Sequence, residues 1–77
     1  MQITIYTKSN CPNCTTAKQL LHEKALQYTE FDAENPAWRI ELLDRVPSVR
    51  QMPAIFINEQ FVGGLAGLQA ALKQVGL

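Results

Sequence analysis

The chain has 77 residues, of which 47% are hydrophobic and 18% are charged, and seven Lys and Arg balance seven Asp and Glu. This length predicts a single domain spanning residues 1–77 with one modest core. The hydrophobic content excludes a disordered chain, and the neutral, scattered charge argues against a nucleic-acid partner, which requires clustered cations.

The sequence gives no sign of a membrane partner or of secretion. No apolar run approaches the roughly 18 residues required to cross a bilayer. The N-terminus opens on a strand-like pattern, without the basic and long apolar regions of a signal peptide. We therefore expect a cytoplasmic protein. In a reducing compartment, two close cysteines serve redox or metal chemistry more often than structure.

The first half of the chain predicts a strand, a helix and a second strand. Residues 2–6 alternate and are rich in β-branched and aromatic types, which is typical of a strand. A helix is expected from Pro12 to about Lys24, because proline suits the first helical position and apolar residues then recur at helical spacing. Cys11 becomes its N-cap. Residues 27–32 alternate again and predict the second strand.

The second half predicts two helices around a hairpin. Caps, prolines and apolar periodicity mark the boundaries. The predicted elements are a helix that follows the Asn35 cap and stops before Pro47, a strand at 53–57, a turn at 58–59, a partner strand at 60–62, and a helix that begins near Leu65 and ends at Gly76. The order β-α-β-α-β-β-α indicates an α/β fold with helices packed on a mixed sheet.

The strongest chemical signal is Cys11-Pro12-Asn13-Cys14, between the first strand and the first helix. A cysteine at an N-cap faces free N–H groups and the positive end of the helix dipole, so we expect a lowered pKa for Cys11, with Lys8 as a second cationic influence. The three-residue step puts both sulfurs on one face, close enough for a disulfide. Cys11 would attack a substrate disulfide and Cys14 would displace the product.

Two other interpretations of the cysteines are weaker. Zinc needs about four ligands, and beyond these thiols the chain offers His22 and scattered carboxylates, so we expect no metal site. Two unrelated buried cysteines would not explain Pro12 or the strand-to-helix placement. Redox chemistry is therefore favoured, and His22 receives no role.

Three further groups of residues have ordinary structural explanations. Pro53 can simply open a strand, and Gly63-Gly64 can provide a positive-φ turn into the last helix. The glycines can also let a ligand approach the backbone, with N–H groups near Leu65 receiving a carboxylate. The aromatic side chains fit core or near-core positions and the arginines fit solvated ones, unless an arginine lies near Cys11 and attracts an acidic substrate; these residues are Phe31, Trp38, Phe56, Phe61, Arg39, Arg45 and Arg50.

Three motifs together resemble the glutaredoxins over essentially the whole chain: Tyr6-Thr7-Lys8 before the cysteine motif, the segment MPAIFI at 52–57, and Gly63-Gly64. The resemblance implies a thioredoxin-like fold, with a four-stranded mixed sheet flanked by three helices and a cis Met52–Pro53 bond facing the cysteines. It also implies a thiol–disulfide oxidoreductase, with Cys11 as nucleophile and Cys14 as resolving thiol.

The resemblance further implies a glutathione site. Glutathione would be a co-substrate, with no cofactor tightly bound. The backbone of Met52 would pair with glutathione or a substrate peptide, and Lys8 would hold the glycine carboxylate. The implied contacts are Lys8, Pro12, Asn13, Arg39, Gln51, Met52, Pro53, Gly63, Gly64 and Leu65. We expect a monomer whose partners are glutathione and disulfide-containing proteins.

The sequence departs from the family pattern at two places. Asn13 occupies a position that is usually tyrosine, and Leu65-Ala66 stands where a polar residue and an aspartate usually bind the γ-glutamyl end of glutathione. The second departure opens an alternative: a glutaredoxin-like electron donor to ribonucleotide reductase that thioredoxin reductase reduces. A non-enzymatic iron–sulfur carrier, holding a cluster between two subunits through Cys11 and glutathione, is a third hypothesis.

Overall fold

The computed structural model describes all 77 residues as one four-stranded sheet and three helices. The element types and their order are those predicted from the sequence. No helix is both long and apolar enough to span a membrane. In chain order the elements are β1 (Ile3–Thr7), α1 (Pro12–Glu23), β2 (Thr29–Asp32), α2 (Pro36–Arg45), β3 (Ala54–Ile57), β4 (Gln60–Gly63) and α3 (Leu65–Gln74).

The sheet has the strand order β2-β1-β3-β4. β1 pairs with β2 in parallel and with β3 antiparallel, and β3 and β4 form an antiparallel hairpin. This confirms the predicted thioredoxin-like fold with a mixed sheet. β2 is two residues shorter than predicted, because its pairing with β1 begins only at Thr4 and Thr29.

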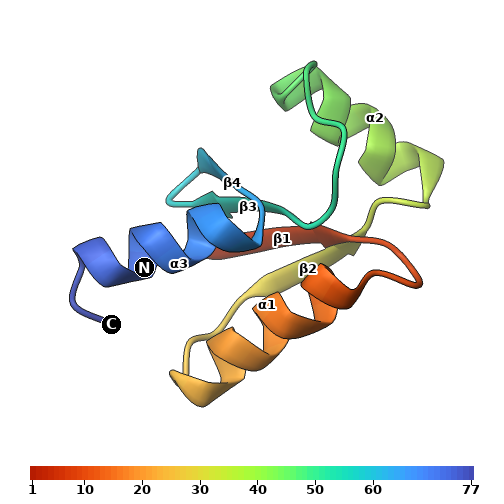
Figure 1. The fold of residues 1–77 in the computed structure, drawn as a ribbon. Coiled ribbons are helices and arrows are strands. Elements are labelled where there is room, and N and C mark those ends of the chain that lie inside the picture. Colours follow the sequence, from red (N-terminus) through yellow and green to blue (C-terminus); the bar gives the residue numbers. More distant parts are fainter.

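The helices divide between the two faces of the sheet, with α2 lying apart from α1 and α3 (Figure 1). Side chains alternate along a strand, so neighbouring residues of β1 point to opposite faces. Ile5 packs against α1 and α3, whereas Tyr6 packs on the α2 face. The cluster under α1 and α3 contains Ile3, Ile5, Ala17, Leu21, Ile55, Leu68 and Leu72, and the cluster under α2 contains Tyr6, Ala33, Leu42, Ala54 and Phe56.

Local capping explains where the first two helices begin. Cys11 is extended and its sulfur accepts the Cys14 N–H, while Pro12 occupies the first turn. Asn35 plays the same part for α2, where its Oδ1 accepts the Ala37 N–H at 3.0 Å. A side-chain acceptor followed by a first-turn proline leaves fewer unpaired N–H groups at the helix start.

The hairpin and its glycines bring α3 close to the sheet. Asn58 and Glu59 have positive φ values of 50° and 68°, as a tight type I′ turn between strands requires. Gly63 has φ +103°, a conformation that side-chain-bearing residues rarely adopt, and it ends β4. A Cβ at Gly67 would overlap the Val62 carbonyl oxygen, so only glycine lets α3 lie this near β4.

Phe61 is more exposed than its predicted core or near-core position suggested. It is 43% exposed because β4 is the last strand at its edge of the sheet, and its ring leans on Phe56 at 5.3 Å between centroids. Phe56 itself is buried.

Candidate functional site

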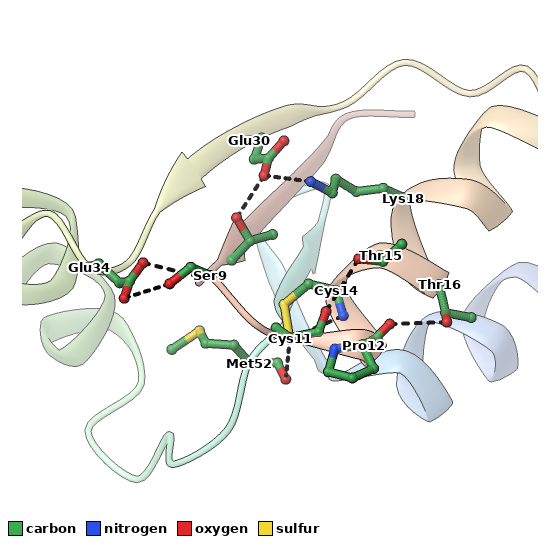
Figure 2. The surroundings of a disulfide bond; sticks show 11 residues. Ser9, Cys11, Pro12, Cys14, Thr15, Thr16, Lys18, Glu30, Glu34 and Met52 are labelled. Atoms are coloured by element: carbon green, nitrogen blue, oxygen red, sulfur yellow. Dashed lines mark hydrogen bonds and ion pairs between the residues drawn. A yellow bond between two sulfur atoms is a disulfide. The ribbon is translucent and has the colours of Figure 1, made fainter.

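The two cysteines form a disulfide at the start of α1 (Figure 2). Their Cα atoms are 5.2 Å apart, because three residues along a helix return the chain to the same face. The pair lies at the junction between the end of β1 and the start of α1, as predicted. The chain therefore carries a redox-active cysteine pair in its oxidised form.

The two sulfurs differ in accessibility. Cys11 is half-buried, whereas Cys14 is only 2% exposed. Cys14 faces the sheet in the same stripe as Ala17 and Leu21, which are also buried. Cys11 precedes the helix and lies at its N-terminal end. A thiol that approaches from solvent therefore reaches the Cys11 sulfur first.

Backbone groups surround the Cys11 sulfur. The Cys14 N–H donates to Sγ at 3.1 Å, and the Met52 carbonyl oxygen lies 3.5 Å from the same sulfur (Figure 2). The hydrogen bond from the Cys14 N–H and the positive end of the α1 dipole both favour negative charge on this sulfur once the disulfide is reduced.

Two carboxylates hold the segment that leads into the cysteine motif. Hydrogen bonds from the Ser9 backbone and hydroxyl lower the pKa of Glu34, with a smaller contribution from Lys8. The Thr7 hydroxyl donates to Glu30 at 2.7 Å and is the main cause of the lowered pKa of that carboxyl.

Lys18 adds a weaker contribution at Glu30, through an ion pair of 3.1 Å. The residues that donate to Glu30 and Glu34 lie 12 to 25 positions away from these carboxylates in the sequence. No local sequence pattern predicted these contacts, because they depend on how β2 and the following turn lie beside β1.

A cleft of about 460 Å³ opens beside the disulfide. It lies between the residues around the cis Met52–Pro53 bond and the start of α3. A cis bond at this position is what the family resemblance implied. Seven of the predicted binding residues line the cleft: Asn13, Gln51, Met52, Pro53, Gly63, Gly64 and Leu65.

Two other predicted residues lie in a second cavity. Lys8 and Arg39 line a space of about 250 Å³ that shares Met52 with the main cleft. Pro12 lines neither cavity and is exposed at the first turn of α1.

Six further residues line the cleft that were not predicted as ligand contacts. They come from the end of α2 and the loop after it, from β4 and from α3: Val46, Ser48, Val49, Arg50, Phe61 and Ala66. Arg50 is exposed, as predicted, and it lines both cavities, so it is one arginine that lies near the site. Pro47, which ends α2 and starts this loop, is the one local signal that pointed here.

No group of three or more His, Cys, Asp or Glu side chains is placed to hold a metal ion. His22 lies far along α1, where its Nε2 contacts the Tyr28 hydroxyl at 3.2 Å.

Comparison with known proteins assigns this fold and cysteine pair to a family. The family model for glutaredoxin matches residues 3–62. A glutaredoxin of Pseudomonas aeruginosa is 39% identical over 75 residues, which cover 96% of this chain and 87% of that protein. Glutaredoxin 3 of Escherichia coli is 35% identical over 75 residues, covering 97% and 90% of the two chains.

A solved structure agrees. The crystal structure of glutaredoxin 1 from Francisella tularensis, complexed with cacodylate, superposes with a TM-score of 0.80 at 27% identity and covers 96% of this chain and 94% of that one. The motif, the fold, the family match and these relatives lead to one conclusion: the chain belongs to the glutaredoxin family.

Proposed function

We propose that this chain is a dithiol glutaredoxin, a glutathione-linked thiol–disulfide oxidoreductase that reduces protein disulfides or glutathione mixed disulfides. The observation that supports the proposal is the unequal exposure of the two cysteines in one disulfide. Cys11 is half-buried at the N-terminal end of α1, and Cys14 is 2% exposed. An accessible sulfur suits attack on an outside disulfide, and a buried neighbour suits its resolution. Cys11 is therefore the nucleophile and Cys14 the resolving thiol.

The exchange proceeds by two displacements. The Cys11 thiolate attacks one sulfur of the substrate disulfide, whose S–S bond breaks as the other sulfur leaves as a thiolate. Cys14 then loses its proton to solvent and attacks the Cys11 sulfur, which forms the Cys11–Cys14 disulfide and releases the second thiol. Two electrons have passed to the substrate. Two glutathione molecules return the protein to the dithiol and leave as glutathione disulfide.

The cavities supply groups for a glutathione-sized ligand. A volume of about 460 Å³ falls in the range of small-molecule sites. In this proposal the Met52 backbone pairs with the ligand main chain, while Lys8, Arg39 and Gln51 take the glycine carboxylate. Pro12, Asn13 and Pro53 flank the sulfur, and Gly63, Gly64 and Leu65 present backbone at the other end.

One observation favours a second candidate. Leu65 and Ala66 bring no carboxylate to the cleft, which weakens the case for glutathione as reductant. The second candidate is an electron donor to ribonucleotide reductase that thioredoxin reductase regenerates. Both candidates share the same cysteine chemistry and differ in the electron source.

The test equilibrates the protein across glutathione redox buffers and quantifies the Cys11–Cys14 disulfide by alkylation and mass measurement. Cys14→Ser should trap a glutathione adduct on Cys11, and the matched Cys11→Ser control should trap none. An adduct on Cys11→Ser instead would reverse the assigned roles. A disulfide that cycles but equilibrates poorly with glutathione would favour the second candidate.

The proposal places the enzyme in the cytoplasm as a monomer, with glutathione as co-substrate and no tightly bound cofactor. Its further partners are disulfide-containing proteins. Gel filtration of the reduced protein, alone and with glutathione, iron and sulfide added, tests the monomeric state, because a dimer that forms only with these additions would indicate a cluster carrier.

A further inference from the structure

Helix α2 buries one large aliphatic side chain and leaves two exposed. Its inner side packs on the sheet through buried Leu42 and half-buried Trp38. Its outer side carries Ile40, which is 68% exposed, and Leu43, which is 38% exposed. These two residues are three positions apart, so they lie side by side on the helix, and exposed Pro36 precedes Ile40 by four positions on the same side. We call Pro36, Ile40 and Leu43 the outer face of α2.

The other large hydrophobic side chains that are exposed have simpler explanations. Met1, Val75 and Leu77 lie at the ends of the chain, and Phe61 leans on the buried Phe56. Single exposed apolar residues are normal at a protein surface and need no partner. The outer face of α2 differs, because its two aliphatic side chains adjoin each other in the middle of the chain and border a cavity.

The outer face of α2 is continuous with the disulfide through the second cavity. Leu43 belongs to both, and Arg39 of the same helix also lines that cavity. The second cavity shares Arg50 and Met52 with the main cleft. The Met52 carbonyl oxygen in turn lies 3.5 Å from the Cys11 sulfur (Figure 2). A polypeptide with its own cysteine at Cys11 can therefore extend over the second cavity and onto α2.

The charges around the second cavity determine which polypeptide suits this path. Lys8, Arg39 and Arg50 line the cavity together with one carboxylate, Glu34, so three positive charges and one negative charge leave a net charge of +2. Glu34 accepts the backbone N–H and the hydroxyl of Ser9, at 3.0 and 3.1 Å. The one ion pair of the protein lies elsewhere, so none of the three cations is paired with a carboxylate. A segment that carries a carboxylate fits this cavity better than a basic one.

The acidic residues of α2 lie off the path. Glu41 and Asp44 each follow a residue of the outer face by one position, which turns them about 100° around the helix, and they line neither cavity. Arg39 precedes Ile40 by one position and turns the other way, towards the second cavity. The outer face of α2 therefore has cations on the side of the disulfide and carboxylates on the far side.

From this arrangement we infer that the outer face of α2 and the second cavity form a docking surface for polypeptide substrates. The occupant is a segment of a partner protein that carries a carboxylate beside its oxidised cysteine and an aliphatic side chain beyond the carboxylate. The carboxylate lies among the cations of the cavity, and the aliphatic side chain packs on Ile40 and Leu43. The inference rests on the proposed function and names a substrate class for it. Glutathione has no aliphatic side chain and gains nothing from Ile40.

The experiment uses three capped heptapeptides, each joined through its cysteine to thionitrobenzoate. The first is acetyl-Leu-Glu-Gly-Cys-Gly-Glu-Leu-amide, whose symmetry makes the result independent of the direction in which the peptide lies. The second has serine in place of both leucines, and the third has lysine in place of both glutamates.

The measured step is the first displacement. The Cys11 thiolate of the reduced protein attacks the peptide sulfur, forms a mixed disulfide and expels the yellow thionitrobenzoate thiolate, so stopped-flow absorbance gives the second-order rate constant. Dividing each rate constant by that of the same peptide with free mercaptoethanol removes differences in intrinsic reactivity.

The unaltered protein should react about five times faster with the leucine peptide than with the serine peptide, the ratio expected when one leucine side chain is half-buried. It should react about ten times slower with the lysine peptide than with the first, and added salt should shrink this difference because salt screens the charges.

Ile40→Gln should lower the leucine-to-serine ratio to about two or less, because it removes the more exposed part of the aliphatic surface. The matched control is Val75→Gln, which should keep the ratio, because Val75 is 59% exposed but follows α3 and lines neither cavity. Both variants should fold, since both side chains are exposed and glutamine is a good helix former. Circular dichroism checks this.

Equal rates for the leucine and serine peptides with the unaltered protein would overturn the inference without any variant. A ratio that Ile40→Gln leaves unchanged, or a preference for the lysine peptide, would also overturn it. So would sedimentation equilibrium that shows a dimer which Ile40→Gln dissociates, because the outer face of α2 would then bind a second copy of the chain. Each of these results leaves the proposed function standing, because thionitrobenzoate is still released. If the reduced protein releases it neither from the peptides nor from its mixed disulfide with glutathione, the proposed function fails and the inference fails with it.

Discussion

The two faces of the sheet are built from different side chains and do different work. The face under α1 and α3 is an aliphatic core of seven buried residues, two of them on α1, which also buries Cys14. The face under α2 is an aromatic cluster in which α2 contributes one buried residue, Leu42. Both cavities are lined by α2 or the loop after it, and the main cleft is bounded on its other side by the start of α3. The aliphatic face therefore holds the cysteine helix, and the ligand space opens beside the α2 segment.

Two neighbouring residues of β1 show the same contrast. The Thr7 hydroxyl is buried and donates to Glu30, whereas the Tyr6 hydroxyl is buried on the opposite face without a hydrogen-bond partner. Tyr6 packs instead on Phe31 and Phe56, at 5.4 and 5.8 Å between ring centroids. Aromatic rings therefore fill the α2 face of the sheet, and this packing leaves the Tyr6 hydroxyl buried without a hydrogen bond.

The largest expected effect compares a leucine from each face. Leu21→Ala should lower the free energy of unfolding by about 3 to 5 kcal/mol, because it leaves a sealed cavity in the aliphatic core. Leu42→Ala should cost less, about 2 kcal/mol, because Leu42 already borders a cavity that solvent can enter. Urea unfolding followed by circular dichroism measures both. Equal losses would remove the distinction between the faces.

Two glycines sharpen the comparison at the next magnitude. Gly67→Ala would push a methyl into the Val62 carbonyl, so α3 must move and stability should fall by about 2 to 3 kcal/mol. Gly64→Ala meets only the Pro53 carbonyl at 3.3 Å, on the side of the cleft, and should cost less than about 1 kcal/mol. Thermal melts of the two variants measure which loses more stability. A larger loss for Gly64→Ala than for Gly67→Ala would contradict this account.

The two buried hydroxyls should respond with opposite signs. Tyr6→Phe removes the unpaired group and should raise the free energy of unfolding by about 1 kcal/mol. Thr7→Val removes a hydrogen bond to a carboxylate and should lower it by about 1 kcal/mol. Urea titrations measure both, and destabilisation by Tyr6→Phe would mean that the hydroxyl has a partner in solution.

The smallest effect is a dependence on pH at Glu30. Hydrogen bonding from Thr7 lowers the pKa of this carboxyl below 4.5 in the folded protein. A group with a depressed folded pKa contributes stability above its unfolded pKa and loses that contribution as pH falls through the folded value. Because the side chain is 37% exposed, solvent screening limits the contribution to about 0.5 kcal/mol.

Glu30→Gln should therefore be less stable than the unaltered protein at pH 7 and equally stable at strongly acidic pH. Melting temperatures collected between pH 2 and pH 7 follow the difference. A difference in melting temperature that persists in acid would show that the Thr7–Glu30 contact depends on packing and not on the charge of the carboxylate.

Much of the fold was predictable because its signals are local. The Cys11 and Asn35 caps, each followed by a proline, mark helix starts through contacts within three residues. The alternation in β1 and the turn at Asn58 and Glu59 are equally short-range. The start of β2 was misplaced by two residues, because a strand end is set by the strand it pairs with and not by its own sequence.

The candidate site divides in the same way. The cysteine motif and its helix position are local, so the disulfide could be foreseen from spacing. Arg50 resembled any solvated arginine until the loop after α2 brought it to both cavities. The exposure of Phe61 likewise depends on the edge position of β4 and not on residue type.

By itself the sequence determined the order of elements, the cysteine chemistry and the family, because periodicity, capping and motif spacing act over a few residues. Only the tertiary structure decided which sulfur is exposed and which side chains line the cleft. It also decided that no carboxylate lines the main cleft beside Cys11. These properties arise where segments distant in sequence meet, such as the Met52 loop and the start of α3, and packing alone sets their positions.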